Sequence, residues 1–263
     1  MRAFRAAAVA MTACVAAALA GCSDDASARW SEKPVGEPVL PDFMPVPPAD
    51  IHTKLDGTTW TVEFSSTLVN VGEGDFHATA ERLANGPWTV RQDIEHDGGG
   101  ADHVVIPAEP IWGGDGHEHW HLERVVEYHL VRHDAQGRPA SGRGRTDHKV
   151  GFCIYDFEKQ DLDYGPEDAV YDREGCGRSD SALLVMGLSR GWGDVYNWDL
   201  PGQSIDVSDL DDGPYRITAV ADEEGVFEEA STDNNTTWVD FDLSTDAQGN
   251  RLAKVTAVGP QPE

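Results

Sequence analysis

The sequence predicts an all-β fold, a β-sandwich-like single domain with long loops and little helix. Short runs rich in valine, isoleucine, threonine and aromatic residues recur along the chain, and clusters of glycine, proline, asparagine and aspartate separate them. No segment carries apolar residues at a sustained helical period. Short strands with frequent turn signals are typical of sandwiches, and we expect neither an internal repeat nor a second domain boundary.

The first 22 residues have the pattern of an export signal. Arg2 and Arg5 precede an apolar run at 6–20, and Leu-Ala-Gly-Cys at 19–22 has the form of a bacterial lipobox. The apolar run is too short to be a good transmembrane helix. We expect cleavage before Cys22, a lipid on that cysteine, and an exported protein anchored to the outer side of the cytoplasmic membrane, in the cell envelope. A plain secretory signal with a chance cysteine is the alternative.

The chain then divides into a signal peptide at 1–22, a polar, flexible tether at 23–37 and one folded domain at 38–259. The formal charge is −27, and loss of the two signal arginines makes it −27 − 2 = −29 for the mature chain. Such a surface repels nucleic acid, so we expect no nucleic-acid partner, and it attracts amines and basic proteins. Solubility or adaptation to salt is the alternative reason for the charge.

Cysteine usage predicts a single disulfide. Of the four cysteines, Cys14 leaves with the signal and Cys22 is the expected lipid site. Cys153 and Cys176 remain as an even pair in an exported protein, and we expect them to be bonded.

The expected strands follow the turn signals in order. They cover residues 60–69, 88–94, 103–106, 120–131, 149–155, 215–221, 236–243 and 254–258. Because a turn cluster lies at 134–138, the strand at 149–155 should return beside 120–131 as a hairpin. Residues 157–180 carry glycine, proline and many acids, and should form a long loop held by the cysteines.

The most informative motif is His-Glu-His-Trp-His at residues 117–121. Side chains alternate across a strand, so the three histidines share one face, and imidazole is a preferred ligand for copper, zinc, iron and nickel. In an ideal strand the outer two Cα atoms lie roughly 13 Å apart, so one ion can bind all three only if the strand twists or bulges. Gly113, Gly114 and Gly116 let the backbone bend. We predict a transition-metal site; three scattered surface histidines are the alternative.

The motif resembles the copper motif of lysyl oxidases, in which histidine, any residue, histidine, an aromatic and histidine follow one another. Other segments resemble the family in the same order: residues 40–43, 64–67, 149–153, 187–196, 206–215 and 234–235. The resemblance covers most of residues 38–245. It implies that His117, His119 and His121 bind copper.

The resemblance also implies a built-in cofactor, lysine tyrosylquinone, formed by cross-linking Lys149 and Tyr196 with copper and oxygen. Lysyl oxidases use molecular oxygen to convert primary amines to aldehydes, and release ammonia and hydrogen peroxide. The expected substrate is a primary amine or a lysine-containing protein. Asp194, two residues before Tyr196, is the first candidate for the base that abstracts a proton. Its alternative role is to hold the loop by accepting backbone hydrogen bonds.

Members of the family carry a calcium site as well. The matching positions are Asp42, the carbonyl of Phe43, Glu229, Ser231, Asn234 and Asn235. Carboxylate and amide oxygens are ligands that calcium prefers, but Ser231 stands where an acidic or amide side chain is expected. An ion here would fix the acidic loop to the N-terminal Asp42 segment.

Several features depart from the animal enzymes. The chain can form one disulfide instead of several, the connection from Lys149 to Tyr196 is longer, and Trp120 replaces a tyrosine in the copper motif. These departures weigh against a collagen-like or elastin-like substrate. We interpret His129 and His148 as polar strand residues or partners of a ligand, not as a fourth ligand. Two other functions stay open: a non-catalytic copper-binding envelope lipoprotein of the same fold, and a mononuclear zinc or iron site of hydrolytic or oxygenase type.

Overall fold

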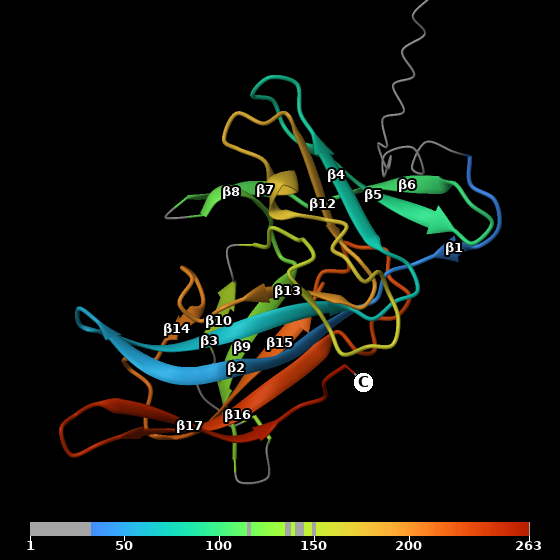
Figure 1. The fold of residues 1–263 in the computed structure, drawn as a ribbon. Helices are drawn as coiled ribbons and strands as arrows, with labels where there is room; N and C mark the ends of the chain where they lie inside the picture. Colours follow the sequence, from blue (N-terminus) through green and yellow to red (C-terminus); the bar gives the residue numbers. More distant parts are fainter. Residues whose placement is uncertain (1–32, 115–116, 135–137, 140–144, 149–150, 263) are drawn as a thin grey trace, which may run out of the picture.

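The computed structural model describes residues 33–114, 117–134, 138–139, 145–148 and 151–262 (Figure 1). The expected signal peptide at 1–22 lies outside these ranges, and so does most of the expected tether. The described end of that tether is hydrogen-bonded to the domain: Val35 N–H donates to the Gly99 carbonyl and Asp97 N–H to the Glu37 carbonyl, each at 3.0 Å. No helix in the described ranges is long and apolar enough to cross a membrane.

The described chain consists of antiparallel strands in four sheets, which confirms the all-β prediction. The first sheet contains β1 (Pro38–Val39), β4 (Phe76–Glu81), β5 (Thr89–His96), β6 (Ala101–Ile106) and β12 (Leu183–Leu188). The second contains β2 (Phe43–Asp56), β3 (Thr59–Asn70), β11 (Glu158–Lys159), β13 (Trp192–Tyr196) and β14 (Ser204–Asp206). The third contains β9 (Val126–Arg132), β10 (Arg145–His148), β15 (Gly213–Ala221), β16 (Thr236–Thr245) and β17 (Arg251–Val258). A hairpin of β7 (Pro110–Gly114) and β8 (His117–Leu122) is the fourth.

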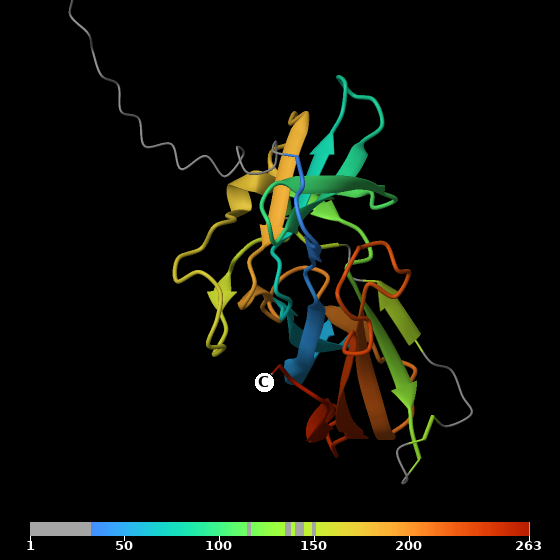
Figure 2. The same ribbon diagram turned by 90° about the vertical axis from the view of Figure 1, so that its right-hand side faces the viewer.

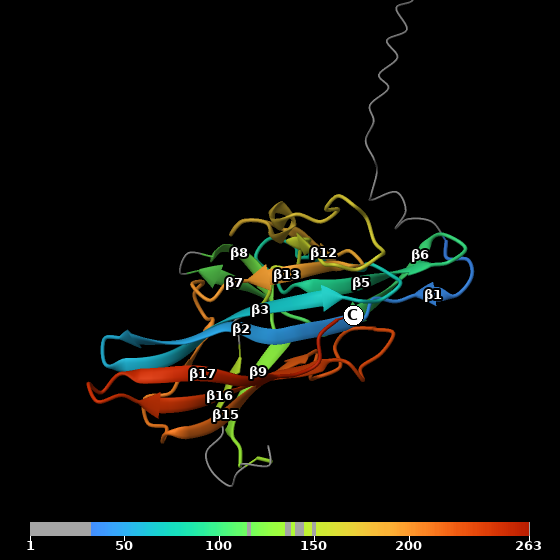
Figure 3. The same ribbon diagram turned by 60° about the horizontal axis from the view of Figure 1, so that its bottom comes forward.

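The second and third sheets stack face to face, as Figures 2 and 3 show, and their inner faces form one core. Phe64 of β3 packs against Tyr128 of β9 with ring centroids 4.9 Å apart. Phe43 and Phe76, 5.0 Å apart, connect this core to the first sheet, and Phe227 packs on both rings. Each fully buried phenylalanine stabilises the fold by about 1.5–3 kcal/mol relative to an exposed one.

Two of the predicted strands are wrong. The strand expected over 120–131 is broken, because β8 ends at Leu122 and β9 begins only after a turn in which Arg124 adopts a φ of 61°. The strand expected at 149–155 does not return beside β9; β10 takes that place. Residues 149–150 lie outside the described ranges, and Gly151, with a φ of 102°, directs the chain away from that sheet.

The remaining predicted strands at 60–69, 88–94, 103–106, 215–221, 236–243 and 254–258 overlap β3, β5, β6, β15, β16 and β17. Several strands were not predicted, among them β2, β4, β12 and β13. Prolines conceal β2 in the sequence, and its pairing with β3 shifts register at two irregularities, between Val46 and Ala49 and between Ala49 and His52.

The long loop expected at 157–180 is held at two points. Cys153 and Cys176 form the predicted disulfide, with Cα atoms 5.7 Å apart, and Cys176 closes the 3-10 turn η1 (Arg173–Cys176). Asp156 is the second point. Its Oδ2 accepts hydrogen bonds from the N–H groups of Val170 at 2.8 Å and Tyr171 at 3.2 Å, and its Oδ1 accepts one from Ser189 N–H at 2.7 Å.

Replacing Asp156 with alanine should lower the free energy of unfolding by about 3 kcal/mol, because buried backbone donors left without an acceptor cost about 1–3 kcal/mol each. Chemical denaturation monitored by fluorescence measures this change. Glu158→Ala, at an exposed position of the neighbouring β11, is the control and should stay within about 0.5 kcal/mol of the parent. Equal stability of the two variants would contradict the role given to Asp156.

Candidate metal centre

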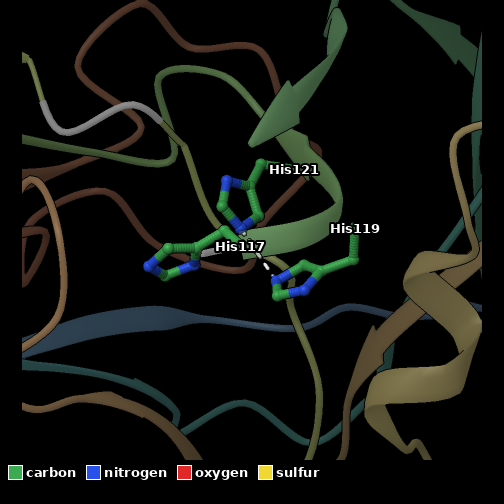
Figure 4. A group of neighbouring side chains, drawn as sticks. All are labelled: His117, His119 and His121. Carbon is green, nitrogen blue, oxygen red and sulfur yellow. Dashed lines mark hydrogen bonds between the residues drawn. The ribbon is translucent and has the colours of Figure 1, made fainter. Parts of the chain in front are cut away.

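The rings of His117, His119 and His121 converge (Figure 4). One nitrogen of each ring lies within 4.8 Å of the other two, and Nε2 of His119 is 2.9 Å from Nε2 of His121. The pairing of β7 with β8 shifts register between Trp112 and Gly114, which is the irregularity that a convergent set of histidines requires on a short strand. The three side chains are therefore arranged to hold one ion.

Two glycines allow the histidine strand to pack closely against its neighbours. A Cβ atom at Gly113 would lie 2.7 Å from the Cβ of His117 and 3.0 Å from Cε1 of His121. A Cβ atom at Gly151 would lie 2.5 Å from the Leu122 carbonyl oxygen and 2.9 Å from the Cβ of His121. Both positions exclude any larger residue, so the spacing of the histidines depends on these glycines.

Trp120 anchors the strand from the opposite face. Its ring packs against Trp88 and Trp112, with centroids 5.1 and 5.6 Å apart, and its Nε1–H donates to the Arg178 carbonyl at 2.7 Å. The Arg82 guanidinium lies 4.6 Å from the Trp120 ring centroid and 4.3 Å from that of Trp88. This aromatic and cationic packing fixes the strand, and with it the direction of the three imidazoles.

The electrostatics of the centre favour metal binding. Burial, and next the charges of His117 and Arg173, together lower the pKa of His119 to about 4. A histidine with that pKa is neutral at pH 7, and its lone pair is available to a metal. Arg173, in η1, was not predicted as part of the site.

Tyr196 lies beside the histidines, as its place in the predicted cofactor requires. Its ring is almost parallel to that of His117, at 6° and a centroid distance of 6.5 Å, and packs on Phe152 at 4.8 Å. The phenol oxygen accepts a hydrogen bond from the Cys153 N–H at 2.7 Å. Burial, and next the charge of Asp194, raise the pKa of Tyr196 well above its usual value. The side chain is thus an immobilised, neutral phenol.

Asp194 shares a face of β13 with Tyr196 and is fully buried. Burial is the main cause that raises the pKa of both Tyr128 and Tyr155, and the charge of Asp194 raises each of them further. The carboxylate thus stands among three tyrosines in the core next to the histidines. Sequence reasoning missed Tyr128 and Tyr155, which reach the site from β9 and from the chain after Cys153.

An open cleft of about 550 Å³ leads from solvent to His119. The residues that line it are Glu118, His119, Arg173, Glu174, Gly177, Arg178 and Ser181. Most of these come from the region of η1, more than fifty positions beyond the histidines. The disulfide to Cys176 holds this region against Cys153, so only the tertiary fold reveals this wall.

Two predicted residues need separate mention. Lys149, the expected cofactor lysine, lies outside the described residues. His129 is not a fourth ligand of the histidine centre: it lies on β9 with Nε2 at 2.8 Å from Oε2 of Glu223, and groups with that residue instead.

The residues expected to bind calcium come together in three dimensions. Glu229 accepts hydrogen bonds from Phe43 N–H and Asn235 Nδ2, each at 2.8 Å, and Asn234 Nδ2 donates to Asp42 Oδ1 at 2.8 Å. Among the described residues, no hydrogen-bond donor reaches the buried Oδ1 atoms of Asn234 and Asn235. Two inward-facing amide oxygens of this kind suit a cation that prefers oxygen ligands.

Ser231, also expected at the calcium site, has a different role. Ser231 accepts a hydrogen bond from the Asp233 N–H at 3.1 Å, which orders the exposed part of the loop. Burial raises the pKa of Glu229 to about 7, and burial also raises that of Asp42. Burial thus disfavours the charged forms of both carboxylates.

Comparison with known sequences agrees with this geometry. The sequence profile of the family described as lysyl oxidase matches residues 101–250, more than half of the 263 residues. The chain belongs to the lysyl oxidase family. The matched region contains the three histidines, Tyr196 and most residues of the expected calcium site.

Curated relatives of this lysyl oxidase family member include the protein-lysine 6-oxidases of pig, cattle and human. The pig protein is 29% identical over 134 residues, which are 49% of this chain and 47% of the pig chain. The bovine and human proteins are 29% and 28% identical over 134 residues, 49% of this chain and 28% of each relative. The chain thus spans about half the length of the pig relative and little more than a quarter of the other two.

Replacing Gly113 with alanine should weaken copper binding at least tenfold, because the added methyl group would displace His117 and His121. Copper per chain after equilibrium dialysis, and a competition titration, measure the change. Gly57→Ala, in the turn between β2 and β3, is the control: its φ of 59° strains an alanine, but no atom lies within 4 Å of its Cβ position, so the substitution displaces no histidine. Unchanged affinity in Gly113→Ala would show that the histidine spacing does not depend on this packing.

Proposed function

We propose that this lysyl oxidase family member is a copper-dependent amine oxidase that converts primary amines, including lysine side chains of proteins, to aldehydes. The observation that carries the proposal is the convergence of three imidazoles beside the parallel ring of Tyr196. Family membership supports the same class of reaction. The names of the curated relatives point to lysine side chains, although the chain spans only part of each.

The proposed cofactors are copper, held by His117, His119 and His121, and lysine tyrosylquinone, formed from Lys149 and Tyr196. The neutral imidazole of His119 and the adjacent phenol of Tyr196 fit these two groups. Together the groups would supply the redox chemistry, in which a primary amine, oxygen and water become an aldehyde, ammonia and hydrogen peroxide, with two electrons passing from the amine to oxygen.

The protein positions the reacting groups and moves a proton. The Cys153 N–H and the Phe152 ring hold Tyr196 in one orientation, and Gln203 Nε2 donates to the Tyr196 carbonyl at 3.2 Å. Asp194, fully buried on the same face of β13, is the proposed base that takes the proton from the carbon next to the amine nitrogen.

The open cleft at His119 is the proposed entrance for the amine. Glu118 and Glu174 offer carboxylates that can pair with a protonated amine, and Arg173 and Arg178 on the same wall balance their charge, so the long-range attraction comes from the rest of the protein. The net charge of −27 extends that attraction over the whole protein and favours basic proteins or small cationic amines as substrates.

We also propose that the protein acts outside the cytoplasmic membrane, attached through a lipid on Cys22. The lipobox pattern motivates this proposal, and the Cys153–Cys176 disulfide supports an oxidising surrounding. The mass of the N-terminal peptide from membrane-purified protein tests it, and an unmodified Cys22 would contradict it.

Tyr196→Phe should bind copper normally but lack both quinone absorbance in the visible range and peroxide production with a primary amine. Peptide mapping of the parent should reveal a covalent bond between Lys149 and Tyr196 that survives denaturation. Tyr164→Phe is the control and should keep copper binding, quinone absorbance and peroxide production. The Tyr164 hydroxyl donates to the Val71 carbonyl at 3.2 Å, which is not part of the histidine centre. Copper-loaded parent protein with an unmodified chain mass would instead support a non-catalytic copper-binding lipoprotein.

We further propose that calcium occupies the site formed by Asp42, Glu229, Asn234 and Asn235. Without calcium, the raised pKa of Glu229, about 7, means that this group stabilises the fold at low pH and that its contribution is lost as pH rises from about 4.5 to about 7. A bound cation reverses this pH dependence of stability, because it binds the ionised carboxylate of Glu229 better than the protonated form.

Adding calcium to EGTA-treated protein should therefore raise the melting temperature more at pH 8 than at pH 5. In Glu229→Gln the calcium effect should disappear at both values of pH. Glu228→Gln, at the exposed neighbouring position, is the control and should respond as the parent does. Differential scanning calorimetry measures the shifts, and an equal calcium response in Glu229→Gln would rule out Glu229 as a ligand.

A further inference from the structure

A second group of metal-ligating side chains lies on the third sheet, away from the histidine centre (Figure 1). It consists of Glu127 and His129 on β9 and Glu223 in the turn after β15, with one donor atom of each within 4.8 Å of the other two. Tyr128, between the first two residues, points into the core. Because side chains alternate across a strand, the group lies on the outer face of β9 and is distinct from the copper and calcium sites.

The turn that carries Glu223 is fixed independently of the cluster. The Asp222 carboxylate accepts hydrogen bonds from the N–H groups of Val226 at 2.7 Å and Phe227 at 2.9 Å. The Asp222 N–H donates to the Val125 carbonyl at 3.0 Å, which ties the turn to the start of β9. Glu223 is therefore presented to β9 by a closed, hydrogen-bonded turn and is not on a loose loop end.

We propose that Glu127, His129 and Glu223 bind a divalent transition-metal ion, with zinc as the type. Imidazole nitrogen and carboxylate oxygen are both ligands that zinc accepts, whereas calcium takes oxygen ligands alone. Two donors on one zinc ion lie at most about 4.2 Å apart, because each bond is about 2.1 Å, so small side-chain rotations complete the triad. The half-buried imidazole and the exposed Glu223 leave a further coordination position open to water.

The positions of the three residues suggest what the ion would do. Glu127 lies opposite His148, the last residue of β10, and Glu223 begins the segment that continues to Glu229 and Asn235 of the calcium site. An ion here joins β9 to that segment at the end of β15, the neighbouring strand. The site would stabilise this side of the domain and takes no part in amine oxidation.

The test uses the mature chain, freed of metals, reloaded with copper and kept in calcium so that those sites are filled. Zinc is then added, unbound metal is removed by gel filtration, and zinc per chain is counted by elemental analysis. Glu223→Ala and His129→Gln should each hold one zinc ion fewer than the parent, and isothermal titration should show affinity at least tenfold weaker. Glu224→Ala is the matched control, because Glu224 is the next residue and pairs with Arg124.

Equal zinc content in the parent and Glu223→Ala would overturn the proposal and leave a simple His129–Glu223 ion pair. Glu223 is exposed, so this variant keeps its fold, and circular dichroism verifies that for each protein. A visible cobalt spectrum that is present in the parent and in Glu224→Ala, and altered in Glu223→Ala, supports the site independently. The comparison does not depend on oxidase activity, because an inactive histidine centre would affect all variants alike.

Discussion

The two residues Phe152 and Cys153 are the constraint on which the candidate site depends. Phe152 exchanges two backbone hydrogen bonds with Leu122, of 2.8 and 2.9 Å, at the end of the histidine strand. Cys153 donates its N–H to the Tyr196 phenol and is bonded through sulfur to Cys176 in η1. Three segments distant in sequence, namely the histidine strand, the strand with Tyr196 and the cleft wall, are thus joined through one dipeptide, and both of its residues are buried.

The fold class was predictable because it rests on composition and punctuation, which are local. Strands such as β3, β15 and β16 carry enough β-branched and aromatic residues to be recognised singly. β2 was not recognised, because three prolines interrupt it and its pairing with β3 is irregular at two points. The prediction of one continuous strand across β8 and β9 was wrong for a related reason. Arg124 adopts a left-handed backbone conformation, which is uncommon for arginine and therefore is not predicted from the sequence.

The histidine centre was predictable in part, because its three histidines recur at every second residue of a strand. The alternation of His117, His119 and His121 suffices to place them on one face, and the motif order suffices to suggest Tyr196. Sequence could not supply Arg173, which comes close to His119 only because the disulfide holds η1 in place, or Tyr155, which comes close to Asp194 only in the folded chain.

The glycine packing of the histidine strand has a thermodynamic consequence. Gly113 and Gly151 pack against the histidine strand, and Trp120 anchors it from the opposite face. This packing restricts the motion of the three imidazoles. The conformational entropy of the three histidine side chains is therefore lost when the chain folds. Little further entropy is lost when an ion binds. The affinity of the proposed metal site would then depend on the stability of the β7–β8 hairpin, and fraying of that hairpin would be the route by which an ion leaves.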